Sequence, residues 1–436
     1  MADDRNGPTD APPGPAPPMD HGAMYRSDAV PGTGGVLKQR EEDFLVDELP
    51  LYPPNGQGEH FMMLVEKRGL STLQLVSILA RHFDIPRNAV GYAGLKDRHA
   101  ITRQHITVHV PGRRFEDFPS LQHDRVQILW IDRHDRKLRR GHLEGNGFSI
   151  RVRGVSMQAA LHAHRTLEIL EAKGMPNGFG QQRFGQWGTN HRIGRALVLG
   201  RAEEACDLLL GPTPAAAGDP SREAYAAGDL KGAFEALPRS AEAERRVLDA
   251  LLHGKRPNQA IARLGKTETT FMVSALQGAI LNDVLHERMR RGMLDTLVEG
   301  DIAVVHGARR TTFMVSAEEA ASPETAERLS RLEVSPTGPL WGPKMRLAGG
   351  EIARMERAAL EAHGLTPESI EQFAKKHRGG IDGDRRPLRV PLRYPQVEGG
   401  ADEHGTYVRC GFELPRGSFA TEAMAEVMKP DRAAGA

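Results

Sequence analysis

Strand-like and helix-like segments follow one another along this chain in an order that limits its possible folds. Apolar and polar residues alternate at 104–110, at 148–155 and again at 406–414, close to both ends of the chain. Between about 174 and 390 the sequence is instead rich in helical stretches of Ala, Leu, Glu and Arg. We therefore expect an α+β domain that carries a large insertion between its strand-rich ends.

Local signals predict further elements within this order. Ser71 or Thr72 caps a helix that runs to Phe83, because apolar residues recur there at helical spacing. Residues 36–46 predict two short strands around a turn, and Ser418 is a candidate cap for a last helix.

The first 35 residues have a different composition from the rest of the chain. They hold seven prolines and six glycines, and few large apolar side chains. Such a segment cannot bury enough apolar surface to offset the entropy lost on ordering. We therefore predict a disordered tail over 1–35, and a frayed C-terminus over 430–436.

Composition excludes several classes of protein. Lys and Arg number 58 against 57 Asp and Glu, so the net charge of +1 gives no overall sign of nucleic-acid binding. No stretch approaches the roughly 18 consecutive apolar residues of a membrane span. Cys206 and Cys410 provide neither a disulfide framework nor a zinc quartet, which favours the reducing cytoplasm. No glycine-rich phosphate loop follows a predicted strand, so a nucleotide cofactor is not indicated.

The most unusual local sequence is Gly-Tyr-Ala-Gly-Leu-Lys-Asp-Arg-His at 91–99, in which Asp97 stands between Lys96 and Arg98. The neighbouring cations favour the ionised carboxylate and so lower its pKa. A single charged carboxylate suits nucleophilic attack, proton abstraction or stabilisation of positive charge. On local chemistry alone, a turn aspartate in a surface ion-pair cluster is the more common case.

A basic cluster follows this loop. Between residues 96 and 153 there are thirteen Lys and Arg but seven Asp and Glu. Such clusters contact phosphates, although a solvated charged face is the usual alternative. His134 and Asp135 within it resemble a metal-binding pair, but no partner motif accompanies them, and we expect no metal site. The candidate contacts to an RNA backbone are Arg133, Arg136, Lys137, Arg139 and Arg140.

Three glycine-bearing turns are predicted beyond the aspartate loop. In Gly145-Asn146-Gly147-Phe148, Asn146 offers the donor and acceptor needed to read a base edge, and Phe148 either stacks on a base or fills the core. The turns at 176–185 and 414–421 each present an aromatic residue next to a cation.

Together these motifs resemble the TruD family of tRNA pseudouridine synthases. The family's motifs appear in the family's order and cover the chain from about 36 to 429. The resemblance implies a mixed-sheet catalytic core, split into 36–173 and 393–429, with a TRUD-type α/β domain inserted at 174–392. The matching segments are Lys38 with Glu42-Asp43-Phe44, 93–98 with 102–104, 145–148, 177–185 and 417–421.

The resemblance also implies roles for charged residues. Asp97 corresponds to the essential aspartate, and Lys38 corresponds to a conserved basic residue near it. Lys96 is a further substrate-binding candidate. Whether Lys38 or Lys96 holds Asp97 ionised stays open at this point.

The substrate-contacting positions implied by the resemblance are mostly aromatic. Phe44, Asn146 and Phe419 match such positions, and Phe148 occupies the aromatic place beside the uracil. Arg183 is the corresponding candidate in the segment 177–185, where Gly178 replaces an aromatic residue that relatives often have.

The implied activity is the conversion of uridine to pseudouridine in tRNA, with the uridine at position thirteen in the D-arm region as the target. The reaction breaks the C1′–N1 bond and makes a C1′–C5 bond without redox change, so no cofactor is expected. Asp97 could attack the sugar or the base, or take a sugar proton to give a glycal. The alternatives are a non-catalytic tRNA- or RNA-binding protein and a synthase acting on another RNA. We expect a cytoplasmic monomer.

Overall fold

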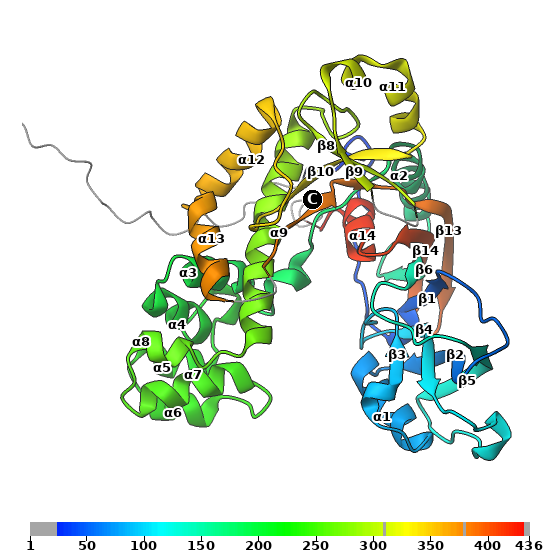
Figure 1. Ribbon diagram of the computed structural model, residues 1–436, viewed down its shortest axis with the longest axis horizontal. Coiled ribbons are helices and arrows are strands. Elements are labelled where there is room, and N and C mark those ends of the chain that lie inside the picture. The colour runs from blue at the N-terminus through cyan, green and yellow to red at the C-terminus, as the bar shows by residue number, and fades with distance from the viewer. Residues whose placement is uncertain (1–23, 308–310, 378–380, 431–436) are drawn as a thin grey trace, which may run out of the picture.

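The computed structural model describes residues 24–307, 311–377 and 381–430, which form two lobes joined at one end (Figure 1). We call residues 36–173 and 393–429 the sheet lobe, and residues 174–392 the insert lobe. The sheet lobe contains an eight-stranded sheet of order β13-β14-β6-β1-β4-β2-β5, with β3 paired to β4. Its strands are β1 Phe44–Pro50, β2 His60–Arg68, β3 Val90–Tyr92, β4 Ile101–His109, β5 Val126–His134, β6 Leu143–Arg153, β13 Arg393–Asp402 and β14 Gly405–Pro415.

Strands from both ends of the chain lie side by side in this sheet. β14 pairs with β6 across nine registered positions, from Tyr407 opposite Arg153 to Pro415 opposite Gly145. All pairings are antiparallel except that of β1 with β4, which is parallel. The mixed sheet with its helices confirms the predicted α+β class.

Apolar alternation places one face of the sheet in the core, as predicted. The alternate residues Val408, Cys410, Phe412 and Leu414 of β14 are all buried. They pack in one cluster with side chains of α2 (Ala159–Lys173) and α14 (Ala420–Met428). At the other end of the sheet, α1 (Thr72–His82) covers β2 and β4. The predicted cap is also found, because the Ser71 hydroxyl accepts a hydrogen bond from the Gln74 backbone N–H.

Three local predictions are wrong. Residues 36–46 contain one strand, β1 from Phe44, preceded by the short 3-10 helix Glu41–Asp43, and Val36 makes only an isolated bridge to Arg153. Gly145-Asn146-Gly147 does not form a turn but lies inside β6, because β1 and β14 pair with this segment from both sides. A Cβ atom at residue 145 would collide with the Leu414 carbonyl oxygen, so the strand needs glycine there. The last helix has Phe419 rather than Ser418 at its N-cap position.

The insert lobe combines helices with a second sheet of order β11-β10-β8-β9. Its longest helix, α9 (Lys266–Arg290), lies on the side that faces the sheet lobe (Figure 1). No helix among the described residues is long and apolar enough to cross a membrane. The other elements are β7 Met175–Pro176, α3 Asn190–Val198, α4 Ala202–Leu210, α5 Pro220–Ala226, α6 Leu230–Ala236, α7 Glu242–Leu252, α8 Pro257–Ile261, β8 Ile302–Val305, β9 Thr311–Met314, α10 Ala317–Ala321, α11 Pro323–Ser330, β10 Val334–Leu340, α12 Gly350–Ala362, α13 Pro367–Lys376, β11 Asp384–Pro387 and β12 Arg389–Val390.

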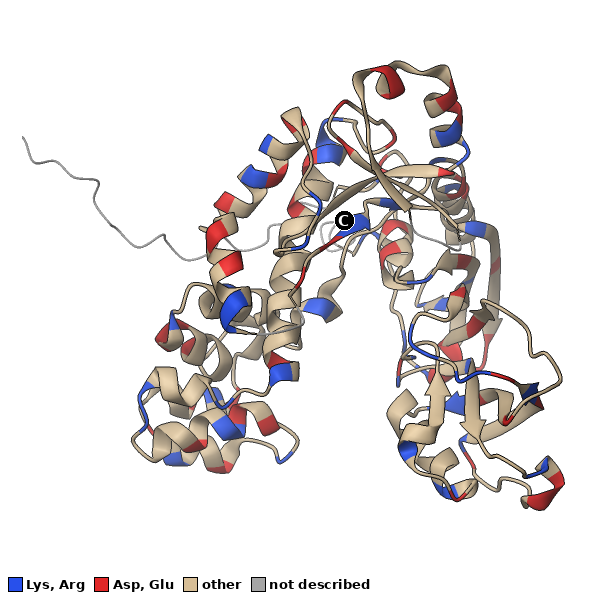
Figure 2. Ribbon diagram, in the orientation of Figure 1, with Lys and Arg blue, Asp and Glu red and all other residues tan. Residues whose placement is uncertain are grey.

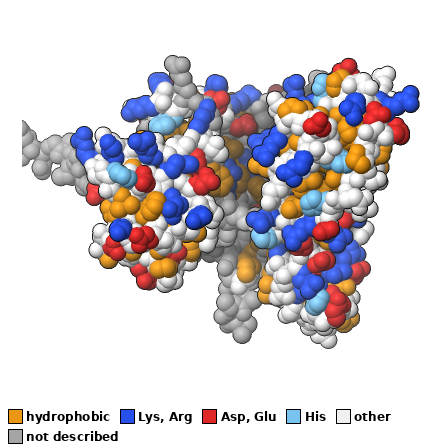
Figure 3. All heavy atoms as spheres, turned by 90° about the horizontal axis from the view of Figure 1, so that it is seen from below, with side chains coloured by type: hydrophobic (Ala, Val, Ile, Leu, Met, Phe, Trp, Pro, Cys, Tyr) orange, Lys and Arg blue, Asp and Glu red, His pale blue; other side chains and the backbone are white. Residues whose placement is uncertain are grey.

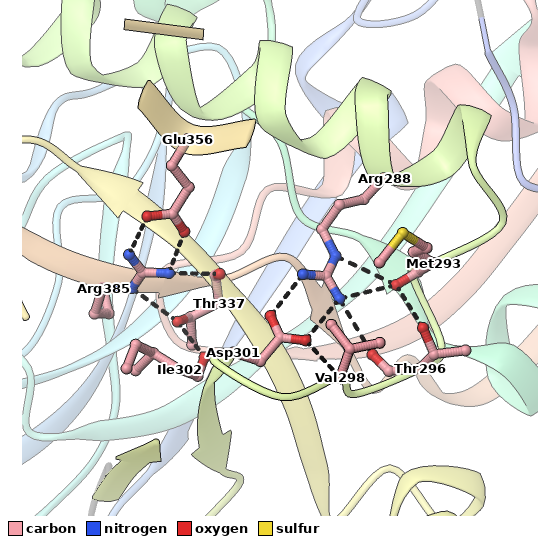
Figure 4. Close-up of polar contacts among 9 residues, drawn as sticks. All are labelled: Arg288, Met293, Thr296, Val298, Asp301, Ile302, Thr337, Glu356 and Arg385. Atoms are coloured by element: carbon pink, nitrogen blue, oxygen red, sulfur yellow. Dashed lines mark hydrogen bonds and ion pairs between the residues drawn. The ribbon is translucent and has the colours of Figure 1, made fainter. Parts of the chain in front are cut away.

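Two buried ion pairs fix helices of the insert lobe to its sheet (Figure 4). Arg288 of α9 lies 2.6 Å from Asp301, which directly precedes β8. Arg385 of β11 lies 2.6 Å from Glu356 of α12 and also donates to the Thr337 carbonyl of β10. Because a buried charge without a partner is costly, each pair specifies how its helix sits on the sheet.

The N-terminal segment differs from the prediction of a disordered tail over 1–35. Residues 1–23 lie outside the described residues, but residues 24–35 contact α14 and β6. The backbone N–H groups of Arg26 and Ser27 donate to the Glu426 carboxylate at 2.8 and 3.1 Å, and the Ser27 hydroxyl donates to it at 2.7 Å. Polar contacts to a buried carboxylate therefore order a segment that has few apolar side chains.

We predict that Glu426→Ala lowers the free energy of unfolding by roughly 2–4 kcal/mol, because three donors lose their buried acceptor. Urea denaturation measures the change. Glu361→Ala, which removes an exposed glutamate near the end of α12, should leave the unfolding midpoint unchanged. Equal midpoints for both variants would contradict the role given to Glu426.

Candidate active site

The parallel strands β1 and β4 separate partway along their length. Their registered pairing ends at Asp47 opposite Arg103, although both strands continue beyond it. The Glu48 side chain fills the opening and is completely buried. Its carboxylate accepts a hydrogen bond from the His105 backbone N–H at 3.0 Å and lies 2.7 Å from the Lys96 ammonium, which is only 5% exposed.

The charges of this buried pair balance one another. Burial alone would raise the pKa of Glu48, but the hydrogen bonds from His105 and the charge of Lys96 outweigh it and lower the pKa. Burial lowers the pKa of Lys96, while Glu48 opposes that change. We conclude that Glu48 is ionised and that Lys96 serves as its counter-ion.

Lys96 also fixes the orientation of Asn146. Asn146 lies opposite Glu48 in the pairing of β6 with β1, and its Oδ1 atom accepts a hydrogen bond from the Lys96 ammonium. An ammonium group can only donate, so the amide oxygen must face Lys96. The amide nitrogen of Asn146 is thereby left as the donor of this side chain.

Three contacts anchor the loop that carries Asp97. The Lys96 backbone N–H donates to the Thr72 hydroxyl at 2.9 Å, at the first residue of α1. The Lys67 ammonium donates to the Asp97 carbonyl at 2.8 Å. The Asp97 carboxylate accepts the His99 backbone N–H at 3.1 Å. The loop is therefore held to β2 by Lys67 and to α1 by Thr72, and the His99 N–H holds the Asp97 carboxylate within the loop.

Lys38, rather than Lys96, is the partner of Asp97. The Lys38 ammonium forms an ion pair with Asp97 Oδ2 and lies 4.4 Å above the centre of the Phe44 ring. Burial would raise the pKa of Asp97, but the hydrogen bond and charge of Lys38 and the His99 N–H outweigh it and lower the pKa. The Asp97 side chain remains 29% exposed, so an ionised carboxylate is accessible from solvent.

A second buried ion pair holds the segment that carries Lys38. Asp43 in the short 3-10 helix Glu41–Asp43 is buried 2.7 Å from Arg153 of β6. The backbone N–H and carbonyl of Arg153 also exchange hydrogen bonds of 3.0 Å with Val36. Lys38 itself has φ 56°, in the left-handed region that residues other than glycine rarely adopt.

Aromatic side chains pack beside the Lys38–Asp97 ion pair. The rings of Phe44 and Phe148 are 6.4 Å apart in an edge-to-face arrangement, and Phe148 lies 5.7 Å from Phe412. Phe44 is buried, whereas Phe148 is only partly buried. Phe148 therefore packs on the core and still presents part of its ring at the surface.

Phe419 and Arg183 lie together at a separate place, where the lobes meet. Both pack against Phe179 of the insert lobe, at 5.8 Å between ring centres for Phe419 and at 5.1 Å for the Arg183 guanidinium. Among the described residues, no hydrogen bond, ion pair or ring contact links either residue to Lys38 or Asp97.

The predicted basic cluster is only partly free to contact RNA. Arg133 donates to the Gly58 and Arg113 carbonyls, Lys137 donates to the Asn88 carbonyl, and Arg140 donates to the Tyr92 hydroxyl. Arg136, Arg139 and Arg140 are exposed. His134 and Asp135 are 3.6 Å apart, but no group of three metal-ligating side chains forms in the described part of the chain.

Charge on the surface follows the balanced composition. Along the ribbon, basic and acidic residues are both distributed over the two lobes (Figure 2). Seen from below, the lobes are separated by a hollow, with Lys and Arg side chains on both sides of it (Figure 3).

Comparison with known proteins identifies the family. The family model for tRNA pseudouridine synthase D (TruD) matches residues 20–427. The chain belongs to the TruD family. Relatives named tRNA pseudouridine synthase D from Geobacter metallireducens and Geobacter sulfurreducens are each 40% identical, over 94% of this chain and 98% of theirs. A crystal structure from Methanosarcina mazei with the same TruD designation has a TM-score of 0.75 and 26% identity, covering 93% of this chain and 96% of that one.

Sequence reasoning on the TruD motifs missed two charged residues of the site, Glu48 and Lys67. Both side chains point inward from their strands. Glu48 lies on the same face of β1 as Phe44 and Val46, and Lys67 lies on the same face of β2 as Val65. Each follows a continuous apolar run, Phe44-Leu45-Val46 on β1 and Phe61 to Val65 on β2, so no clean alternation marked it. The available signal was only a charge at the two-residue spacing of the inward positions. Burial lowers the pKa of Lys67 to about 8.

We predict that Glu48→Gln lowers the free energy of unfolding by about 3–5 kcal/mol, because the Lys96 ammonium is left buried without a counter-ion. Adding Lys96→Met to the same chain should recover most of the loss, since no unpaired buried charge remains. A double-mutant cycle by urea denaturation measures the coupling. Strictly additive losses would contradict the pairing of Glu48 with Lys96.

Proposed function

We propose that this protein converts a uridine of tRNA to pseudouridine, and that the target is the uridine at position thirteen in the D-arm region. The observation that carries the proposal is an accessible Asp97 carboxylate, kept ionised by Lys38, in a chain that belongs to the TruD family. The Geobacter relatives are named for activity on tRNA.

The reaction requires that the base be detached, turned and rejoined. The C1′–N1 bond breaks, the uracil rotates, and C5 bonds to C1′; C5 then loses a proton and N1 gains one. Nothing is oxidised and no group is transferred. The protein must therefore hold a base that is out of its stack and supply a carboxylate at the sugar. A carboxylate next to the sugar is compatible with three roles for Asp97: attack on the sugar, attack on the base, or abstraction of a sugar proton.

Asn146 is proposed to hold the base through its amide nitrogen. Because Lys96 occupies Oδ1, the amide donates to a uracil carbonyl oxygen and cannot turn to accept instead. Phe148, on the same strand two residues on, presents the exposed part of its ring to the uracil. Glu48 acts as a positioning residue, since it fixes Lys96 and, through Lys96, the orientation of the amide.

The remaining predicted contacts are given supporting roles. Lys38 keeps Asp97 ionised, and the face of the Phe44 ring holds the Lys38 ammonium through a cation–π contact. Phe419 and Arg183 contact the RNA where the lobes meet. Of the basic cluster, the exposed Arg136, Arg139 and Arg140 are the proposed contacts to the phosphate backbone.

We also propose that the protein acts as a monomer, as the resemblance to the TruD family implies. The thiols of Cys206 and Cys410 are free and buried. This supports the cytoplasm, where thiols stay reduced, as the place of action.

Asp97→Asn keeps the shape of the side chain but removes its charge. We predict that it reduces pseudouridine formation on the order of a thousandfold or more, while tRNA affinity stays close to that of the wild type. Carbodiimide-stop sequencing of tRNA transcripts measures the product and its position. Asp124→Asn, at an exposed site of the same lobe, is the matched control.

Full activity of Asp97→Asn would refute catalysis by this residue. Binding without product from the wild type would favour a non-catalytic RNA-binding protein. A single product at another uridine or in another RNA would correct the target.

Lys38→Met tests the electrostatic role of Lys38. Without this cation, burial raises the pKa of Asp97, so a larger fraction is protonated at any given acidic pH. We predict that the acid limb of the kcat/KM profile moves to higher pH by about 1–3 units. Lys38→Arg keeps the cation and should keep the limb near its wild-type position. Superimposable acid limbs for Lys38→Met and the wild type would contradict this role.

A further inference from the structure

A line of neighbouring aromatic and guanidinium side chains runs from the sheet lobe into the insert lobe. Phe419 at the start of α14 lies 5.8 Å from Phe179, measured between ring centres. The Arg183 guanidinium lies 5.1 Å from the Phe179 ring and 5.7 Å from the ring of Phe271 on α9. Aromatic and guanidinium groups thus follow one another over four residues from three separate segments.

The two ends of this line are exposed. Phe271 is 43% and Phe419 is 39% exposed. All fourteen phenylalanines lie in the described residues, and these two alone are exposed. Single exposed apolar side chains are common on protein surfaces, but here both exposed phenylalanines belong to the same line of aromatic and guanidinium groups.

Phe179, in the middle of the line, is held rigidly by the insert lobe. Asn282 of α9 accepts from the Phe179 backbone N–H at 2.9 Å and donates to its carbonyl at 2.8 Å. A Cβ atom on Gly278 would press on the Phe179 ring, so glycine there lets the ring lie against α9. On another side, the Arg386 guanidinium lies 4.2 Å from the same ring and donates to the Asn177 carbonyl and side-chain oxygens.

Among the residues that the structure describes, Arg183 differs from Arg386 in having no polar partner. Its Nε atom is buried without a hydrogen bond, and no ion pair reaches its guanidinium among the described residues. Burial lowers its pKa. A guanidinium held between two rings, with its donors unused, is suited to a ligand that offers both flat rings and anionic oxygens.

We propose that Phe419, Phe179, Arg183 and Phe271 form a stacking ladder in which the two exposed rings, Phe419 and Phe271, stack on unpaired nucleotides that flank the target uridine. The buried Phe179 and the Arg183 guanidinium connect these two rings and hold them in place. The proposal rests on the proposed function, because removing a uridine from its stack leaves neighbouring bases without partners. Aromatic side chains and arginine planes are the groups on which unstacked RNA bases are commonly held. Phe271 is the outer rung and takes no part in the chemistry at Asp97.

The test compares Phe271→Ala and Phe271→Trp with the wild type, using unmodified tRNA transcript as the ligand. Phe271→Ala should raise the Kd for tRNA, and the KM, on the order of tenfold. Because the ring is uncharged, the ratio of Kd values should be the same at about 50 and 200 mM salt. Phe271→Trp should restore binding to the wild-type level or better.

Leu161→Ala, which removes another exposed apolar side chain on α2 of the sheet lobe, is the control and should bind tRNA as the wild type does. Wild-type affinity of Phe271→Ala would overturn the ladder, as would equal weakening by Leu161→Ala. Pseudouridine formation by the wild type is measured in the same preparations. If the wild type forms product while Phe271→Ala binds normally, the ladder alone fails; if the wild type forms none, the proposed function fails.

Discussion

The buried ion pair between Glu48 and Lys96 is the interaction on which the candidate site depends. The parallel strands β1 and β4 pair only as far as Asp47 and Arg103, and the space beyond is filled by this pair. An opening in a sheet would otherwise expose backbone groups and core side chains, so polar groups must satisfy one another there. The same pair fixes the residue before Asp97 and the amide of Asn146, and therefore joins the carboxylate and the proposed base contact in one rigid unit.

The rest of the structure supports this unit from two directions. On the sheet lobe, Arg153 holds the segment of Lys38 through Asp43, while Glu426 holds residues 26 and 27 against α14. On the insert lobe, buried pairs such as Arg288 with Asp301 fix α9, and α9 in turn holds Phe179 through Asn282. Each connection uses a charged or amide group that is buried and satisfied, which specifies one geometry rather than a range of them. The proposed RNA contacts of the sheet lobe and of the insert lobe are thus held in position by polar contacts as much as by apolar packing.

The sequence could predict those features that depend on local periodicity. The helix from Thr72, the inward face of β14 and the α+β class all follow from patterns of 3.6 or 2 residues. The loop around Asp97 was recognisable because two cations flank a carboxylate after glycines. Features that depend on distant partners could not be predicted in this way. Composition indicated disorder for residues 24–35 because it does not reveal the Glu426 carboxylate some 400 positions away, and Gly145 suggested a turn because its two strand partners lie far along the chain. For the same reason, the choice of Lys38 over Lys96 as the partner of Asp97 required the fold.

In the proposed complex, one uridine leaves its stack and lies between Asn146, Phe148 and the carboxylate at position 97. A structure of the Asp97→Asn variant bound to unmodified tRNA tests it most directly. The account predicts a single extruded uridine whose carbonyl oxygen accepts from the Asn146 amide nitrogen, with its C1′ facing residue 97 and Lys96 still on the amide oxygen. A bound tRNA whose uridines all remain stacked, or an extruded base that sits away from residue 97, would contradict it.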